Sequence, residues 1–369
     1  MPFRRKKFIF LVQGEGRGHM TQAISLYQIL TNHGHQIQHI FIGNSKRREV
    51  PEYFIKSFNA PVELIDSPNF ICDHRNKSIR LIPSIIYNLK YLNRFRKSLK
   101  RIHIVMSQNM PDTLINFYDF LGGFYNFFYR PKARYIVIGH QFLASHPEFR
   151  FSPGNPVHKN LFLGYNYLTS LGAELKLALS FMPYRPQKIG NMMIVPPLLR
   201  DQLHQLKVDK KDFILGYMVN DGYSQEIINW NRRNPATRLH IFWDKKGEPE
   251  VKYITDTLAF HQLNADKFLG MMAECRGFIT TAGFESICEA LYLGKPVLMV
   301  PVKGQYEQAC NAIEAVKAGA GIQADYFGIS MLLEFISLYK QKIKDFKAWY
   351  AQGHSLFVKE LTGSTAMPE

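Results

Sequence analysis

Residues 277–312 have the sequence GFITTAGFESICEALYLGKPVLMVPVKGQYEQACNA, and this stretch decides the fold. The apolar runs at 277–280 and 297–300 have the length of short buried strands, and the second run lies between two prolines. A tight turn at 281–285 follows the first run, and the residues after it have the composition of a helix. Two continuous apolar strands joined through a helix predict a β-α-β unit in a parallel sheet.

The helix of this unit is predicted to begin at Ser286, because serine is a good N-cap and Glu289 stands at the capping-box spacing from it. Gly294, followed by lysine and proline, is predicted to end the helix. A helix start at the carboxyl edge of a parallel sheet favours a phosphate, through its free N–H groups and its dipole. Glu289 in the first turn can then accept hydrogen bonds from a ribose, although a plain helix cap explains the same two residues.

The loop after the second strand carries Gln305, Glu307 and Gln308, whose polar groups suit sugar hydroxyls. The pattern Gly-Phe-Glu-Ser-x-x-Glu-Ala-x-x-x-Gly-Lys-Pro, followed by Glu-Gln-x-x-Asn-Ala, resembles the donor-site signature of nucleotide-sugar glycosyltransferases with the GT-B fold. It is similar to the UDP-glycosyltransferases and to the N-acetylglucosaminyltransferase that forms lipid II. The resemblance implies an α/β protein with two Rossmann-like domains, whose parallel sheets face each other across a cleft.

In these families the residues of the signature hold the parts of a nucleoside diphosphate-sugar, which is a substrate, so no separate cofactor is expected. The serine and the preceding glycine contact the diphosphate, the next glutamate binds the ribose, and the later Glu-Gln pair holds the sugar. The loop after the strand at 213–219 faces the phosphates, and the loop at 260–263 reads the nucleobase. The donor-binding residues implied are Gly18, Asn220, His261, Gln262, Thr281, Gly283, Phe284, Ser286, Glu289, Glu307 and Gln308.

Two positions depart from the plant-type form of this signature. Thr281 stands where a phosphate-binding histidine is usual, and Glu285 stands where asparagine is usual. A threonine hydroxyl can still donate to a phosphate, whereas a glutamate beside a diphosphate is unfavourable unless it points away.

Composition describes an ordinary globular protein with a basic first half. The 369 residues suffice for two domains, and the 46% hydrophobic and 21% charged residues are typical of a globular chain. The four cysteines lack Cys-x-x-Cys spacing, which favours reduced thiols in a cytoplasmic protein. Residues 1–200 hold 27 Lys and Arg against 10 Asp and Glu, whereas residues 201–369 hold 19 against 20. The basicity therefore concerns the partner of the first half.

The chain opens with an apolar strand at 8–12, too short for a signal peptide, and a glycine-rich loop that ends in His19. A helix at 21–31 and a second strand at 35–43 complete a Rossmann-like opening. A dehydrogenase is one alternative, but no acidic residue ends the second strand, where a dinucleotide site requires one. In the resembled families a histidine here acts as general base, and a pKa near 6.5 suits that role. A packed loop histidine is the other interpretation of His19.

A buried segment that begins at Pro111 ends in Asp119. In plant-type relatives an aspartate at the end of such a strand orients the catalytic histidine, which makes Asp119 the candidate partner of His19 and Asp112 the reserve. A helix cap is the alternative role of Asp119. The strand predicted at 134–139 ends in His140 and Gln141, which we expect on the acceptor side of the cleft.

Two segments of the first half suggest a lipid surface. Residues 84–102 fit an amphipathic helix with Lys90, Arg94, Lys97 and Arg101 on one side. Residues 120–134 combine aromatic with basic side chains, which suits a membrane interface or a lipid-linked acceptor. The alternative is an ordinary helix with a solvated basic face. No nucleic-acid motif accompanies the charge, so nucleic acid is not an expected partner.

The predicted domains are 1–199 for the acceptor, 200–338 for the donor, and a C-terminal helix at 339–369 that crosses back to the first domain, as the fold implies. Apart from these, a helix at 157–178, a strand at 179–182 and one long helix at 329–350 are expected.

The sequence thus predicts an inverting glycosyltransferase that moves a sugar, with UDP-sugar as the expected donor, to a hydroxyl acceptor. No Asp-x-Asp occurs in the chain, so a metal-bound diphosphate is not indicated, and a helix N-terminus can take that role. A nucleotide-sugar 2-epimerase and a non-catalytic binding protein stay open as alternatives. The expected location is the cytoplasm, with peripheral association to the inner face of the membrane as the lipid hypothesis requires.

Overall fold

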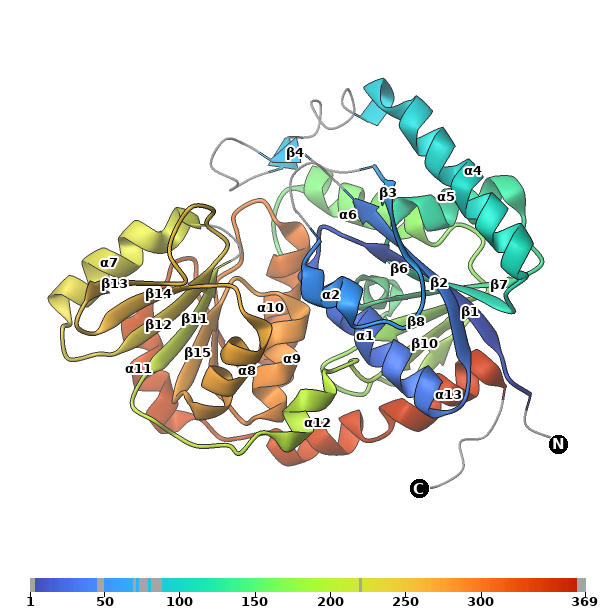
Figure 1. Ribbon diagram of the computed structural model, residues 1–369. Coiled ribbons are helices and arrows are strands. Elements are labelled where there is room, and N and C mark those ends of the chain that lie inside the picture. Colours follow the sequence, from blue (N-terminus) through green and yellow to red (C-terminus); the bar gives the residue numbers. More distant parts are fainter. Residues whose placement is uncertain are drawn as a thin grey trace.

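The computed structural model describes residues 4–44, 50–68, 71–72, 79–80, 88–218 and 221–363. Two parallel sheets, each with helices on both faces, lie side by side, one in each half of the chain (Figure 1). The α/β architecture with two facing sheets agrees with the sequence prediction. Helices α1, α9 and α10 lie where the two halves meet (Figure 1).

The first half forms an eight-stranded sheet in the order β3-β2-β1-β6-β7-β8-β10-β9, in which β9 alone is antiparallel to its neighbour. Strand β1 is central and its apolar side chains are fully buried, because helices cover both faces of the sheet. The strands are β1 (Lys7–Gln13), β2 (Gln36–Asn44), β3 (Val62–Asp66), β6 (Thr113–Phe117), β7 (Arg134–Gly139), β8 (Leu175–Leu179), β9 (Lys188–Ile189) and β10 (Met192–Val195). A separate two-stranded ribbon joins β4 (Ile71–Cys72) and β5 (Ile79–Arg80).

The second half forms a seven-stranded sheet in the order β13-β14-β12-β11-β15-β16-β17, with β13 antiparallel at its edge. The central strand β15 (Gly277–Thr280) is the first apolar run of the decisive stretch, and β16 (Val297–Met299) is the second, paired in parallel as predicted. The other strands are β11 (Ile214–Met218), β12 (Leu239–Trp243), β13 (Val251–Thr255), β14 (Leu258–Gln262) and β17 (Gly321–Gln323).

The helices follow the strands in chain order and position the site from both halves. Those of the first half are α1 (Arg17–Asn32), α2 (Glu52–Lys56), α4 (Leu92–Asn109), α5 (Phe120–Tyr129), η1 (His140–Ser145) and α6 (Pro156–Thr169). Those of the second half are η2 (Asp201–Gln205), η3 (Asp221–Tyr223), α7 (Ser224–Arg233), α8 (Ala265–Glu274), α9 (Phe284–Tyr292), α10 (Tyr306–Lys317) and α11 (Ile329–Leu338).

The last two helices, α12 (Ile343–Tyr350) and α13 (Gly353–Thr362), run back from the second half to the first along the bottom of the view (Figure 1). The Trp349 indole N–H donates to the Ser180 carbonyl at 3.0 Å, and Arg134 donates to the carbonyls of Glu360 and Leu361. The C-terminal segment therefore ties the two sheets together.

Four local predictions were wrong. The helix expected at 157–178 ends at Thr169, because Gly172 turns the chain at φ +67°. The strand expected at 179–182 is instead β8, which lies earlier, at 175–179. The long helix expected at 329–350 is two helices, since Tyr339 has an extended backbone that ends α11.

The basic helix expected at 84–102 is interrupted by a turn at Tyr91: residues 88–90 are helical, and α4 begins at Leu92 and extends past the predicted end to Asn109. Of that predicted span, residues 84–87 lie outside the described part of the chain. Leu89 and Leu92 are exposed, although Phe95 and Ile102 pack inward as predicted.

We expect Trp349→Ala to lower the midpoint of thermal unfolding by several degrees, because truncating a buried tryptophan costs about 3–5 kcal/mol. Trp349→Phe is the matched comparison, since it keeps one buried aromatic ring; it removes the hydrogen bond to Ser180, worth about 1 kcal/mol, and part of the packing of the indole, so it should cost less than Trp349→Ala. Equal midpoints for Trp349→Ala and the wild type would show that the C-terminal helices do not stabilise the first half.

Candidate active site

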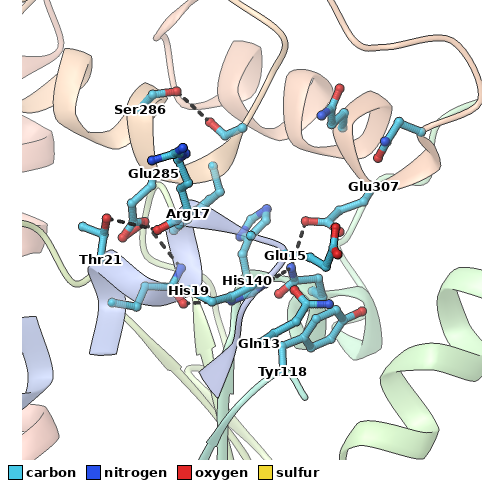
Figure 2. A pocket seen from close by; sticks show the side chains of 18 of the residues that line it. Gln13, Glu15, Arg17, His19, Thr21, Tyr118, His140, Glu285, Ser286 and Glu307 are labelled. Carbon is cyan, nitrogen blue, oxygen red and sulfur yellow. Dashed lines mark hydrogen bonds between the residues drawn. The ribbon is translucent and has the colours of Figure 1, made fainter. Parts of the chain in front are cut away.

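A cavity of about 410 Å³ lies between the two halves. Figure 2 shows Glu285, Ser286 and Glu307 extending from helices of the second half toward Arg17, His19 and Tyr118 of the first half. The cavity is lined from the first half by α1, η1 and α6, and from the second half by the starts of α8, α9 and α10. Of the predicted site residues, those that line it are Gly18, His19, His140, Gln141, Gly283, Phe284, Ser286, Glu289, Glu307 and Gln308.

The start of α1 is placed by a close contact between two loops. Gly14 N donates to Gly43 O at 3.0 Å, and a Cβ on Gly14 would come within 2.5 Å of that carbonyl oxygen, so glycine is required there. The helix begins at Arg17, four residues earlier than predicted, with Gly16 as N-cap and no side-chain cap. His19 therefore lies in the first turn of a helix, and the first N–H groups of α1 carry no side-chain acceptor.

The start of α9 differs from the prediction that Ser286 is the N-cap. The N-cap is Gly283, because Ala282 turns the chain at φ +59° and the helix begins directly afterwards at Phe284. No side chain caps this helix start either. Ser286 is the third helical residue, and its hydroxyl donates to the Gly283 carbonyl at 3.3 Å. A Cβ on Gly18 would lie 3.6 Å from the Cβ of Glu285, which is van der Waals contact, so the starts of α1 and α9 pack against each other in the cavity wall.

Glu289 lies in the second turn of α9, and a cation from the linker between the halves holds it. The Arg200 guanidinium contacts Glu289 Oε1 through Nε at 2.7 Å and through Nη2 at 2.6 Å. Burial raises the pKa of Glu289, and the charge of Arg200 opposes that shift. The carboxylate expected to receive a ribose is thus paired with Arg200, which itself lines the cavity.

The His19 ring is buried in the cavity wall between two amides and a ring. Its Nδ1 lies 3.3 Å from Gln22 Oε1, and its Nε2 lies 3.4 Å from Gln141 Nε2. The ring stacks on Tyr118 with centroids 5.4 Å apart. Burial lowers the pKa of His19 to about 4, so the imidazole is neutral at pH 7 and can accept a proton.

Asp119 does not orient His19 as predicted. It is the N-cap of α5, where its carboxylate accepts from Leu121 N and from Ser67 Oγ, each at 2.8 Å. Within the described part of the chain, no hydrogen bond links Asp119 to His19. The helix-cap alternative is therefore the role that the structure gives Asp119. The reserve candidate Asp112 lies at the other end of β6, where it accepts from Lys7 N at 2.9 Å.

The sugar-side pair predicted at Glu307 and Gln308 begins α10. The Gln141 amide of the first half donates to Glu307 Oε1 at 2.8 Å, and burial raises the pKa of Glu307 to about 7. Gln308 Oε1 accepts from Val302 N at 2.9 Å, which fixes the loop before the helix.

His140 also lines the cavity, on the floor below α9. Its Nδ1 lies 2.7 Å from the Leu179 carbonyl, so Nδ1 carries the proton, and its ring stacks on Phe284 at 4.2 Å. The Nε2 atom is buried and has no partner among the described residues.

Three predicted donor residues do not line the cavity, and a fourth lies outside the described residues. His261 and Gln262 belong to strand β14, where His261 bonds His240 at 2.9 Å and Gln262 donates to the Lys245 carbonyl. The loop begins only after this strand, so Leu263 and Asn264 line the cavity instead. Thr281 is buried behind the turn, with no partner for its hydroxyl among the described residues. Asn220 lies outside the described residues.

Sequence reasoning missed the residues that reach the cavity from distant segments. Gln22 and Arg200 carry no motif, because their contacts join positions far apart in the chain. Tyr118, Phe162 and Tyr165 form an aromatic part of the lining. The only sequence feature that indicates it is the large number of aromatic residues between 117 and 167.

Two features are absent from the described residues. No group of three or more His, Cys, Asp or Glu side chains there is placed to hold a metal ion. Nor does any helix in the described ranges have the length and apolar character that a membrane crossing requires.

Comparison with known proteins identifies the family. The model of glycosyl transferase family 1 matches residues 6–338, and the chain belongs to this family. The structure is similar to the glycotransferase of kitacinnamycin, with a TM-score of 0.63 at 13% identity over 95% of this chain and 96% of that one. It is similar to CalG4, the calicheamicin glycosyltransferase, with a TM-score of 0.62 at 14% identity over 98% of both chains.

A third solved structure is Phytolacca americana UGT2 complexed with UDP-2fluoro-glucose and pterostilbene, with a TM-score of 0.61 at 11% identity over 96% of each chain. None of the curated proteins matches the sequence. The fold is thus GT-B and the protein is a glycosyltransferase, as the resemblance of the sequence implied.

Asp119 offers a test of the site's electrostatics. Burial raises its pKa from 3.8 to about 6, so the folded protein binds this proton more tightly than the unfolded chain does. The free energy of unfolding should therefore fall as the pH rises from about 4 to about 6, and this group should account for about 3 kcal/mol of the decrease. We expect Asp119→Asn, which keeps a capping oxygen, to remove that part of the slope. Denaturant unfolding of both proteins at pH 4 and pH 7 measures it, and parallel pH dependences would contradict it.

Proposed function

We propose that this protein transfers a sugar from a UDP-sugar to a hydroxyl acceptor, with inversion and without a bound metal. The observation that carries the proposal is the position of a neutral, buried His19 opposite the uncapped start of α9, in one cavity between the two halves. UDP as donor is supported by the signature at 283–312 and by UGT2, which was solved with a UDP-sugar.

In this proposal the acceptor hydroxyl displaces the amide of Gln141 from His19 Nε2. The hydroxyl oxygen attacks the anomeric carbon from the face opposite the diphosphate, and its proton passes to His19. The bond between the anomeric carbon and the diphosphate breaks, and UDP leaves. The N–H groups at the start of α9 stabilise the charge that develops on the diphosphate. One displacement of this kind inverts the anomeric configuration.

His19→Ala separates a catalyst from a binding protein. We expect its turnover with a UDP-sugar and a hydroxyl acceptor to fall by roughly 10²- to 10⁴-fold, because a positioned base contributes about that much. The Kd of UDP, measured by calorimetry, should stay within about twofold of the wild-type value. Saturating UDP should also raise the unfolding midpoint of both proteins, since 100 Kd of ligand adds about 2.7 kcal/mol.

Ligand binding and turnover of the wild type also distinguish the other candidate activities. A midpoint that rises with NAD but not with UDP would replace the transferase by a dehydrogenase. Conversion of the UDP-sugar to its 2-epimer without an acceptor would indicate an epimerase. UDP binding without turnover of any donor would leave a binding protein.

We further propose that the acceptor is lipid-linked and reaches the site from a membrane surface. Phe120, Phe124 and Phe128 form a row along α5, with ring centroids 6.2 and 6.4 Å apart. Phe120 also contacts Tyr165 of the cavity wall at 4.0 Å, so the row leads from the cavity to the surface. Phe128 is 66% exposed at its outer end. Basic residues follow α5, and the basic helix α4 packs beside it (Figure 1).

Vesicle sedimentation tests this surface. We expect the wild type to sediment at low salt with phosphatidylcholine vesicles that contain phosphatidylglycerol, and to be released at high salt. Phe127→Ser combined with Phe128→Ser should weaken binding more than roughly tenfold, because each buried phenylalanine contributes about 1.5–3 kcal/mol. Tyr253→Ser, which removes a 75% exposed ring from the second half, is the matched control. Equal sedimentation of all three proteins would contradict the proposal.

A further inference from the structure

The His19 ring contacts two amide side chains, whereas the histidine of a catalytic His-Asp pair contacts a carboxylate. Both of its nitrogens face glutamine amides, Gln22 on one side and Gln141 on the other. We infer that Gln22 is the positioning residue of His19, in the place that a carboxylate holds in a His-Asp pair, that Gln141 holds the same tautomer until the acceptor hydroxyl takes its place at Nε2, and that both amides act only while the two halves are closed. The inference deepens the proposed transferase and rests on His19 as its base.

The Gln22 amide has two partners, one on each side. Its oxygen lies 3.3 Å from His19 Nδ1, while its NH₂ group donates to Glu285 Oε2 at 3.4 Å. In this orientation Glu285 Oε2 is the acceptor of the amide NH₂ group, and the amide oxygen is left to accept from the ring. The oxygen of Gln22 therefore requires a proton on Nδ1, which leaves the lone pair on Nε2.

Gln141 leads to the same tautomer from the other side of the ring. Its NH₂ group donates to Glu307 Oε1 at 2.8 Å and also faces His19 Nε2 at 3.4 Å. The Nε2 atom must then be the acceptor, as the contact of Gln22 requires. Both contacts therefore leave the lone pair on Nε2, at the cavity. An acceptor hydroxyl there would replace the longer contact of Gln141, the one to His19.

Each amide is oriented by a carboxyl group from the opposite half of the protein. Gln22 and Gln141 belong to α1 and η1, whereas Glu285 and Glu307 belong to α9 and α10. Separation of the halves would release both amides and free the ring to change its tautomer. Closure of the cavity and alignment of the base are therefore one event.

An amide partner also differs from a carboxylate in charge. Its hydrogen bond raises the pKa of His19, but it carries no charge, so the effect of burial is larger and the pKa is lowered. The other groups around the ring are Tyr118, stacked on it, and Glu285 and Glu307 beyond the amides, with Glu15 and Arg17 on the same loop and helix. Arg17 pairs with Asp244 at 3.5 Å. A carboxylate at position 22 would add a negative charge in contact with Nδ1.

A charge swap tests the inference. Gln22→Glu combined with Glu285→Gln keeps the bond between positions 22 and 285 but moves the carboxylate next to His19. We expect the acidic limb of the kcat/KM pH profile to move up by roughly one to two pH units, because a contacting opposite charge favours the imidazolium. Gln22→Leu should lower kcat by roughly 10- to 100-fold with little change in the KM of the donor. A swap variant with the wild-type pH profile would overturn the inference.

Nitrogen NMR of ¹⁵N-histidine-labelled protein gives a readout that does not need activity. The chain has 13 histidines, and His19→Gln identifies the His19 signal. We expect a neutral ring with its proton on Nδ1 in the wild type and in Asp119→Asn, the control for the expected dyad, and a raised pKa in the charge swap. A proton on Nε2 in the wild type, or a tautomer that changes in Asp119→Asn, would overturn the positioning roles. The expected spectra without turnover in any variant would support the positioning and reject the transferase.

Discussion

The structure depends on two uncapped helix starts that meet in the wall of one cavity. The first turns of α1 and α9 pack against each other near Gly18 and Glu285, and neither helix has a side-chain cap. Each start carries a partial positive charge of about half a unit, so an anion beside their contact would offset the repulsion between the two ends. Under the proposed function that anion is the diphosphate of the donor, and its binding would favour closure of the halves.

The buried acids of the second half each have a partner that limits the effect of their charge on such an anion. Glu285 and Glu307 meet neutral amides of the first half, and burial raises the pKa of Glu307 to about 7 and that of Glu285 well above its usual range. Glu289 is paired with Arg200. Burial opposes ionisation of Glu285, which reduces the negative charge that this departure from asparagine brings to the cavity.

The sequence predicted the strands well, because full burial gives each parallel strand a continuous apolar run that no loop imitates. It predicted the helix starts less well. At Ser286 a favourable cap residue lost to a turn at Ala282 that begins the helix earlier. The donor side of the site could be predicted because its residues are neighbours in one motif. Gln22 and Arg200 could not, since their roles exist only after distant segments pack together.

The misplaced dyad shows how a single backbone angle changes the chemistry of a site. Tyr118 has φ +65°, and Asn116 bonds Asp119 at both its N–H and its carbonyl, so the turn after β6 is locked. This turn directs the ring of Tyr118 toward His19 and the carboxylate of Asp119 toward Ser67. Asp119 stands where the sequence pattern places the partner of the histidine, but in the structure its neighbour Tyr118 is the residue that contacts His19. Other side chains must then orient the ring of His19. The amides of Gln22 and Gln141 contact it, and both also bond carboxyl groups of the opposite half.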